Sequence, residues 1–480
     1  MMTSLYLGLR RSSLALLAAS SLLAAGAAAQ AQTPFGALDS TSETRVSFSG
    51  AERGTPILAG SEVTVAGQGF QPGQKVTLLY GSTPLQGGAL TADAEGKLSG
   101  KLNVPANAVS GTHPIVVVAQ APYAATIAEL KVSPTVPLSG QQNYEIKEAQ
   151  PVRGMYQSAY SAKNNTVFVT AAVGRPPISQ SELVKLNADT LAVLARVTPA
   201  AAPASERPAP AGAAAPAQPR QPGVFAVYGV GVDDSKDTVW VTNTRQNTVA
   251  VYRQSDLGLI KQFEPGTVSH ARDVVVDMGL GKAYSGATLT PNVVVFNTGD
   301  LSVAKTIEVS SLKRRESFSV ASLSLDQAAH KLYAVSLSTS EVAVIDTQTD
   351  TVEKVLPVPG AEGSIGVAHD PQTGRIFVAS QDTDNLVVLD KDGKVIADTP
   401  IGAGALNVAF DPVKRLAYVA NRGANTVAVT DVDGKIVANL GPSPRANHIA
   451  LGKDGVVYAV DKSASSEAEK DTIQRIRPRK

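Results

Sequence analysis

Arginines occupy loop positions of this 480-residue sequence where guanidinium groups could bind phosphate or carboxylate. An arginine presents a planar fork of N–H donors that matches either anion. Tyrosines stand at two equivalent places at the start of apolar segments, where a ring can stack on a base or a sugar. We therefore expect a ligand-binding site for an anionic compound, made by Arg153, Tyr156, Tyr228, Arg245, Arg272, Arg314, Arg422 and Arg445.

Four other polar side chains offer an alternative, a site for a divalent cation. Gln157, Asp273, Asn407 and His448 lie one step along the chain from the tyrosine and arginine positions and carry oxygen and nitrogen donors. Only one of them is a carboxylate, and each also fits as a capped strand start. A metal-dependent hydrolase of the lactonase kind is therefore the less favoured alternative, and we expect no metal site.

Other catalytic chemistry has little support in the sequence. The absence of cysteine excludes thiolate metal sites, disulfides and haem attachment through cysteine. No phosphate-cradling glycine loop is present, and no G-x-S-x-G motif stands in a triad context. We expect a protein that is not an enzyme and that has no cofactor.

Residues 1–31 have the pattern of a secretory signal peptide. Arg10 and Arg11 precede an apolar run from Leu14 to Ala25, and small residues at 27, 29 and 31 offer cleavage sites. No later segment is apolar for long enough to span a membrane. A periplasmic or secreted protein is therefore expected. With 43 basic and 42 acidic residues, it lacks the overall positive field of many nucleic-acid-binding proteins.

The residues from 143 to 480 repeat a unit of about 42 residues. Each unit alternates apolar and polar residues four times between turn signals, which predicts four short antiparallel strands. Val-rich stretches fit a buried pleated surface, and Asp-Pro or Asp-Gly corners fit tight turns. An aromatic residue marks the second strand of each unit: Phe168, Trp240, Tyr284, Tyr333, Phe377, Tyr418 and Tyr458.

Four-stranded units repeated around an axis predict a β-propeller, here with seven blades. The last unit is one strand short, and the extended stretch from Tyr144 to Val152 supplies a strand ahead of the first unit. We expect this stretch to pair with Ile473–Pro478 and so to close the ring. An Ala/Pro-rich insert at 198–223 cannot bury a core, and it is predicted to be a loop or linker.

Residues 45–134 lie outside the repeat and predict about seven short strands at the spacing of a β-sandwich. The run Gly67-x-Gly69-Phe70-x-Pro72-Gly73 resembles bacterial Ig-like modules of secreted proteins. The expected fold class is thus all-β, a seven-bladed β-propeller preceded by an Ig-like β-sandwich. The sandwich has a plainer interpretation as a spacer or a stabilising cap.

The repeats carry a second resemblance, best seen in VWVTNTRQNTVAVY and AYVANRGANTVAVTD. These stretches resemble YVTN-type propeller repeats, and the order of features over 143–480 resembles periplasmic YncE-like propellers. That resemblance implies a non-enzymatic binding protein associated with DNA, with single-stranded DNA or another polyanion as partner. The Ig-like domain and the Ala/Pro-rich insert are departures from that family.

Assigning loops by the repeat sorts the charges onto two faces of the predicted ring. The face at the entry to the innermost strands is expected to be positive, and a protein of this kind would bind anions there. Arginines on loops are often merely solvated or paired, and a cell-envelope protein-interaction or adhesion scaffold is the alternative function. The positive face receives Arg175, His270, Lys313, Arg315 and Lys462 besides the arginines named above, and the opposite face receives Asp233, Asp234, Asp237, Asp277, Asp326, Asp370, Asp390, Asp392, Asp411, Asp431 and Asp433.

Overall fold

The computed structural model describes residues 43–52, 54–120, 122–203, 223–464, 466 and 469–479. The predicted signal peptide lies outside these ranges, and so does most of the Ala/Pro-rich insert. Over the described residues, no helix combines the length and apolarity needed to cross a bilayer. Nearly all regular structure is β-strand, as the alternating sequence pattern predicts.

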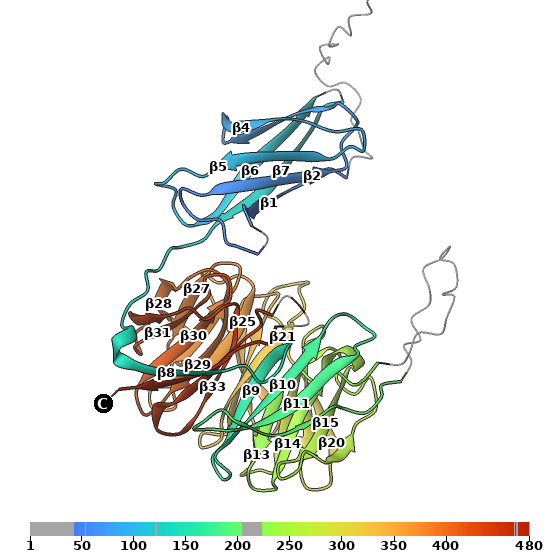
Figure 1. The fold of residues 1–480 in the computed structure, drawn as a ribbon, viewed down its shortest axis with the longest axis vertical. Coiled ribbons are helices and arrows are strands. Elements are labelled where there is room, and N and C mark those ends of the chain that lie inside the picture. The colour runs from blue at the N-terminus through green and yellow to red at the C-terminus, as the bar shows by residue number, and fades with distance from the viewer. Residues whose placement is uncertain are drawn as a thin grey trace, which may run out of the picture.

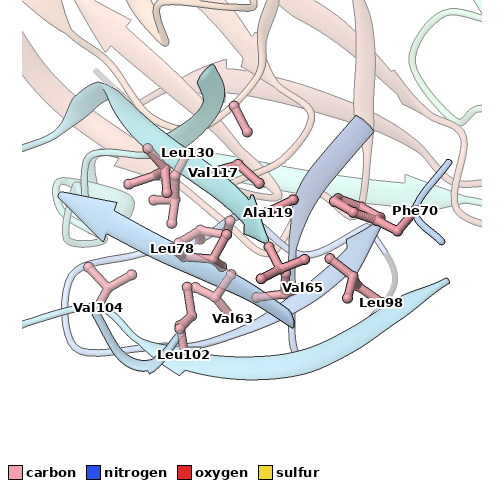
Figure 2. Packing of buried hydrophobic residues seen from close by; sticks show 14 of the residues in the cluster. Val63, Val65, Phe70, Leu78, Leu98, Leu102, Val104, Val117, Ala119 and Leu130 are labelled. Atoms are coloured by element: carbon pink, nitrogen blue, oxygen red, sulfur yellow. The ribbon is translucent and has the colours of Figure 1, made fainter. Parts of the chain in front are cut away.

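The first domain consists of two sheets packed around one apolar core (Figure 2). The core includes Val65, Phe70, Leu78 and Val117, which come from both sheets and their connections. Alternate residues of each strand point inward, so the alternation of apolar and polar residues in the sequence places the apolar side chains on one face of each sheet. Its assignment to the Ig-like family remains a prediction. One sheet is β1 (Arg45–Gly50), β2 (Glu62–Gln68) and β5 (Leu98–Asn103), and the other is β4 (Thr83–Thr91), β3 (Lys75–Tyr80), β6 (Gly111–Gln120) and β7 (Ala124–Val132).

The remaining described residues form a seven-bladed β-propeller, confirming the expected fold class (Figure 1). Each blade is a four-stranded antiparallel sheet, and the first six run from the innermost strand to the outermost in chain order. Their strands are β9 (Met155–Ser161), β10 (Thr166–Val173), β11 (Gln180–Asn187), β12 (Val193–Val197); β13 (Val230–Asp233), β14 (Thr238–Asn243), β15 (Thr248–Arg253), β16 (Leu259–Gln262); β17 (Ala271–Asp277), β18 (Lys282–Ala287), β19 (Asn292–Asn297), β20 (Ser302–Glu308); β21 (Val320–Asp326), β22 (Lys331–Ser336), β23 (Glu341–Asp346), β24 (Thr351–Pro357); β25 (Ser364–His369), β26 (Ile376–Ser380), β27 (Asn385–Leu389), β28 (Val395–Pro400); and β29 (Ala405–Asp411), β30 (Leu416–Asn421), β31 (Thr426–Thr430), β32 (Ile436–Leu440).

The seventh blade joins the two ends of the propeller. It contains β33 (Ala446–Leu451), β34 (Val457–Asp461) and β35 (Ile473–Pro478), with β8 (Tyr144–Ala149) as its outermost strand. In this antiparallel pair Ile473 lies opposite Ala149, and Pro478 lies opposite Tyr144, which confirms the predicted closure. The strand ends before the predicted Val152 because Pro151 has no N–H to continue the ladder.

The aromatic residue of each repeat packs where the blades meet. All seven are buried, and they lie on the second strand of their blades. Their partners on the innermost strand are mostly small, as in Trp240 opposite Gly231 and Tyr418 opposite Ala409. A small residue leaves room for a ring where the blades crowd toward the axis. The regular spacing of these aromatic residues along the sequence thus reflects one packing position between blades that is repeated in every unit.

Two faces of the propeller follow from this strand order. The top face carries the loops that lead into each innermost strand and the loops between second and third strands. The bottom face carries the other loops of each blade. Three short 3-10 helices complete the described structure: η1 (Gln141–Asn143) before β8, η2 (Thr244–Gln246) on the top face and η3 (Lys453–Gly455) on the bottom face.

The first domain contacts the propeller on the top-face side of blade five, beside the blades drawn in orange in Figure 1. Lys131 Nζ lies 2.7 Å from Asp384 Oδ1 and 2.8 Å from the Gln381 carbonyl oxygen. The connecting segment is bound to blade six, where Asn439 Nδ2 donates to the Val136 carbonyl at 2.8 Å. The connection between the domains is therefore held in place by specific contacts.

Candidate anion-binding site

A cavity of about 340 Å³ opens on the top face between the first two blades and the last two. Five of the eight residues that the sequence predicts for the ligand site line it together. They approach from different blades, so the ring closure by β8 and β35 is what brings the two ends of the repeat to one place. The five are Arg153, Tyr156, Tyr228, Arg245 and Arg422, and Lys462 lies with them.

Asp471 fixes the loops that form one wall of the cavity. Its Oδ2 accepts hydrogen bonds from the backbone N–H groups of Gly154 at 2.5 Å and Met155 at 2.8 Å. Its Oδ1 accepts from the Ala464 N–H at 2.6 Å. Gly154 has φ +84°, and a Cβ there would lie 2.6 Å from the Ala172 carbonyl oxygen, so the tight entry into β9 requires glycine.

The two tyrosines form an aromatic wall in contact with cations. Tyr156 and Tyr228 meet edge to face, with ring centroids 5.1 Å apart. The Arg245 guanidinium carbon lies 5.9 Å from the Tyr228 centroid, and Lys462 Nζ lies 5.2 Å from the Tyr156 centroid. Such placements favour the cation electrostatically. Tyr228 is only 7% exposed, so it is a wall of the cavity, and half-buried Tyr156 has the more accessible ring.

Positive charge predominates at this site, because four cations but one carboxylate, that of Asp471, line the cavity. Across the described residues, no cation lining the cavity forms an ion pair with an aspartate or glutamate. Burial lowers the pKa of Arg422, and nearby Arg445 lowers it further. Burial likewise lowers the pKa of Lys462 to about 8, with Arg422 and Arg245 adding to the shift and Asp471 opposing it. An anion would relieve this repulsion.

Arg272 and Arg445 flank the cavity without lining it. The Nε of Arg272 is buried and has no hydrogen-bond partner among the described residues. Burial lowers the pKa of His270, and the charges of Arg245 and Arg272 lower it further. Arg445 is exposed on the loop entering β33, and its guanidinium lies close to Gly54 of the first domain. The cationic surface thus continues from the cavity toward the sandwich.

Glycine in blade two lets the Arg272 backbone approach the neighbouring innermost strand. A Cβ at Gly229 would lie 2.0 Å from the Arg272 carbonyl oxygen, so no other residue fits at this contact. The Gly229 N–H donates to Thr242 Oγ1 at 2.8 Å, and Thr242 Oγ1 donates to the Arg272 carbonyl at 3.0 Å. These bonds fix the neighbours of Gly229, Tyr228 before it and the β13 strand after it.

Arg314 is the predicted residue that the structure does not bring to the cavity. It lies on the exposed loop between β20 and β21, where the Leu312 N–H donates to Glu341 Oε1 at 2.9 Å. The loop is equivalent by repeat position to the one that carries Arg445, but it belongs to blade four. The repeat pattern places Lys462 on the top face, but the predicted ligand site does not include Lys462 or Asp471.

The four residues considered as metal ligands instead join neighbouring blades. Gln157 Oε1 accepts from the Val230 N–H at 3.2 Å, and its Nε2 donates to Asp273 Oδ1 at 2.5 Å. Asp273 Oδ2 accepts from the Leu323 N–H at 3.2 Å. These hydrogen bonds use the side-chain oxygen atoms that would otherwise coordinate a cation.

The other two members of that set behave in the same way. Asn407 Oδ1 accepts from the Ile449 N–H at 2.9 Å, and His448 Nδ1 accepts from the Ser158 N–H at 3.4 Å. Burial lowers the pKa of His448 to about 4, which keeps this nitrogen available as an acceptor. The described residues contain no group of three His, Asp or Glu side chains placed to hold a metal ion.

Comparisons with known proteins agree with the propeller fold. A family model described as "Domain of unknown function (DUF4394)" matches residues 292–438. No curated protein sequence matches the chain.

Several solved structures are similar in fold. Hydrazine synthase of Kuenenia stuttgartiensis matches with a TM-score of 0.52 at 15% identity, over 68% of this chain and 96% of that one. A streptogramin B lyase matches with a TM-score of 0.52 at 14% identity, over 70% of this chain and 99% of that one. U3-55K matches with a TM-score of 0.52 at 10% identity, over 70% of this chain and 98% of that one. At these identities the likeness shows the fold alone. The chain is therefore a seven-bladed β-propeller with an N-terminal two-sheet domain, and the YncE-like assignment remains a prediction.

Proposed function

We propose that this propeller is a non-catalytic binding protein whose top-face cavity holds an anionic segment of a polymer, with single-stranded DNA as the first candidate. The observation that carries the proposal is the group of cations around the cavity that have no carboxylate partner in the described chain. Arg153, Arg245 and Arg422 present guanidinium forks there, and the amine of Lys462 adds a fourth charge. We also propose, from residues 1–31 alone, that the protein is periplasmic or secreted.

The size of the cavity supports one bound unit of such a polymer. A volume of about 340 Å³ is at the lower end of small-ligand sites, so one phosphate with its sugar or base fits inside. Arg272 and Arg445 would then attract the neighbouring phosphates from outside the cavity. Tyr156, beside the cations, supplies the accessible aromatic ring on which a base could stack.

Fluorescence anisotropy with a labelled single-stranded oligonucleotide at low salt tests this proposal. We expect binding by the full-length mature protein and a loss of about tenfold in affinity for Arg422→Ala. Arg314→Ala is the matched control, because it removes the same charge from the same face outside the cavity. Absence of binding at low salt, or an equal loss for both variants, would contradict the site.

A second candidate function, protein interaction through the first domain, rests on a row of apolar side chains. Leu79, Val116 and Ile127 lie opposite one another on the outer face of the β3, β6 and β7 sheet, and Ile127 is 66% exposed. An envelope protein partner could cover this row. Pull-down with Ile127→Glu against wild type would test it, since an unchanged set of partners would remove the candidate.

A further inference from the structure

We propose that Lys462 is a nucleophilic amine that captures a small anionic aldehyde or ketone in the top-face cavity as an imine. The inference rests on the proposed anion site, because the same arginines would hold the anionic group of the compound. It goes beyond that function by assigning covalent chemistry to one residue and a class of small molecule to the cavity.

The position of Lys462 presents its amine to the cavity. The residue directly follows β34, and its Nζ lies over the Tyr156 ring, 5.2 Å from the centroid. Nζ has one long hydrogen bond, 3.4 Å to the Ala172 carbonyl oxygen. Asp471 is near, but both of its oxygens already accept backbone N–H groups. The amine is thus held in place without an ion pair to any described carboxylate.

Charged groups around the amine favour its neutral form. Burial is the largest cause of the lowered pKa, and Arg422 and Arg245 repel a proton on Nζ, while Asp471 attracts one. Arg153 lines the same cavity. Asp461, at the end of β34, is mostly ionised at pH 7.5, although burial raises its pKa to about 6, so it does not help to keep the amine neutral. Desolvation beside other cations is a known way to activate lysine.

The expected gain in reactivity follows from two opposing effects. At pH 7.5 an amine with a pKa of about 8 is deprotonated roughly 200 times more often than an ordinary lysine with a pKa near 10.4. Lower basicity also reduces nucleophilicity, here by roughly tenfold if the dependence resembles that of thiols. A net advantage of roughly tenfold or more over solvent-exposed lysines remains.

The chemical step is balanced without a further reactant. The lone pair of Nζ forms a bond to the carbonyl carbon, and the carbonyl oxygen gains a proton to give a carbinolamine. The carbon–oxygen bond then breaks as the nitrogen loses its second proton, and the oxygen leaves as water, so that both amine protons end up, directly or by exchange through solvent, on the departing water. One amine and one carbonyl thus give one imine and one water, with no oxidation or reduction. Arg245 and Arg422 hold the anionic group of the compound during both steps.

Pyridoxal 5′-phosphate followed by borohydride reduction tests the proposal on the full-length mature protein. The reagent is an aldehyde with a phosphate group, and reduction makes the imine permanent for peptide mass spectrometry. We expect Lys462 to be labelled at least tenfold faster than any other lysine at pH 7.5. Its rate should rise with pH to a plateau, with a midpoint near 8. Labelling spread evenly over exposed lysines would overturn the proposal.

Two controls separate capture from simple reactivity and from the proposed function. Lys462→Arg keeps the charge but cannot form an imine, so fast labelling should disappear, whereas Lys391→Arg removes an exposed lysine and should change nothing. Arg245→Ala should slow labelling by pyridoxal 5′-phosphate more than labelling by neutral propanal, because propanal loses only the effect of Arg245 on the pKa of Lys462, whereas pyridoxal 5′-phosphate also loses the contact with its phosphate group. DNA binding without Lys462 labelling would overturn capture alone. Fast Lys462 labelling without DNA binding would instead overturn the polymer as ligand and leave capture standing.

Discussion

The two faces of the propeller use their cations differently. On the bottom face, cations pair with carboxylates of a neighbouring blade. Arg415 donates to the Asp370 carboxylate through both Nη1 and Nη2, and Lys282 Nζ lies 2.7 Å from Asp350 Oδ2. On the top face, the cations around the cavity have no such partner in the described chain. Pairing across blades stabilises the ring, and unpaired charge is available to a ligand.

The bottom face also shows that aspartate has more than a turn-forming role. Arg375 lies 2.7 Å from Asp433, and Lys163 lies 2.8 Å from Asp237, again between adjacent blades. Structural charges and charges available to a ligand thus differ in whether they have a partner of opposite charge. In the sequence, both kinds are simply charged residues on loops.

The largest expected effect is on the bottom face. Asp370→Ala should lower the free energy of unfolding by about 3 kcal/mol, because Asp370 is fully buried and its loss leaves Arg415 without a partner. Chemical denaturation monitored by circular dichroism measures this. Arg422→Ala serves as the comparison and should change stability by less than about 0.5 kcal/mol or raise it. Equal losses for the two variants would erase the difference between the faces.

Ligand binding should show the reverse pattern. The double variant Arg245→Ala, Arg422→Ala should lose about 2 kcal/mol of affinity for labelled single-stranded DNA, roughly thirtyfold. Its unfolding midpoint should stay that of the wild type, because neither side chain forms an ion pair within the described chain. If the double variant unfolds more easily than the wild type and still binds DNA with normal affinity, these arginines are structural.

The pH dependence of stability should have opposite signs for one lysine on each face. The pKa of Lys462 is lowered to about 8, so the folded state binds fewer protons than the unfolded state between pH 8 and about 10.4. Lys462 then makes stability rise with pH across that window, by about 3 kcal/mol at most. Subtracting the denaturation curve of Lys462→Met from that of wild type isolates this slope, which should be positive.

Lys331 on the bottom face provides the matched case. Its hydrogen bond to Glu353 raises its pKa above the usual value. The contribution of Lys331 to folding stability is therefore fully present below the pKa of an ordinary lysine, and it is lost as pH rises through the raised pKa. The slope obtained by subtracting Lys331→Met from wild type should therefore be negative above pH 10. Slopes of the same sign would contradict the contrast.

The smallest expected effect concerns the top-face ion pair that joins the two domains. Lys131→Met should lower the unfolding free energy of the propeller by about 1 kcal/mol, less than Asp370→Ala, because buried Asp384 still accepts the Gly404 N–H at 2.7 Å when Lys131 is removed. It should still loosen the first domain and increase the radius of gyration in small-angle X-ray scattering. Lys101→Met removes the Glu62 pair inside the first domain and is the control. An equal change for both would show that Lys131 does not hold the domains together.

Much of the fold could be predicted from sequence because each repeat carries the same local signals. The aromatic of the second strand, the Val-rich third strand and the Asp-containing corners recur, and each matches one packing environment. Closure was predictable from the missing strand of the last unit. The end of β8 at Ala149 was also readable, since Pro151 follows it closely.

The candidate site was only partly predictable because it depends on what breaks the repeat. Sorting loops by face placed Arg245 and Arg422 on the top face, and in the structure both line the cavity. The same sorting included Arg314, since repeat position gives the face but not which blades line a cavity. Lys462 and Asp471 come from the loop before β35, which is longer than the loops at the equivalent position in the other units. Their roles follow from three-dimensional contacts.

The salt dependence of DNA binding tests the central claim, that unpaired top-face cations hold an anionic ligand. For wild type, the logarithm of the affinity for labelled single-stranded DNA should fall linearly with the logarithm of salt concentration. In the Arg245→Ala, Arg422→Ala variant the slope should shrink by roughly 1.4, the value for two lost phosphate contacts on a single strand. The same slope in both proteins, or no binding by wild type at low salt, would contradict the account.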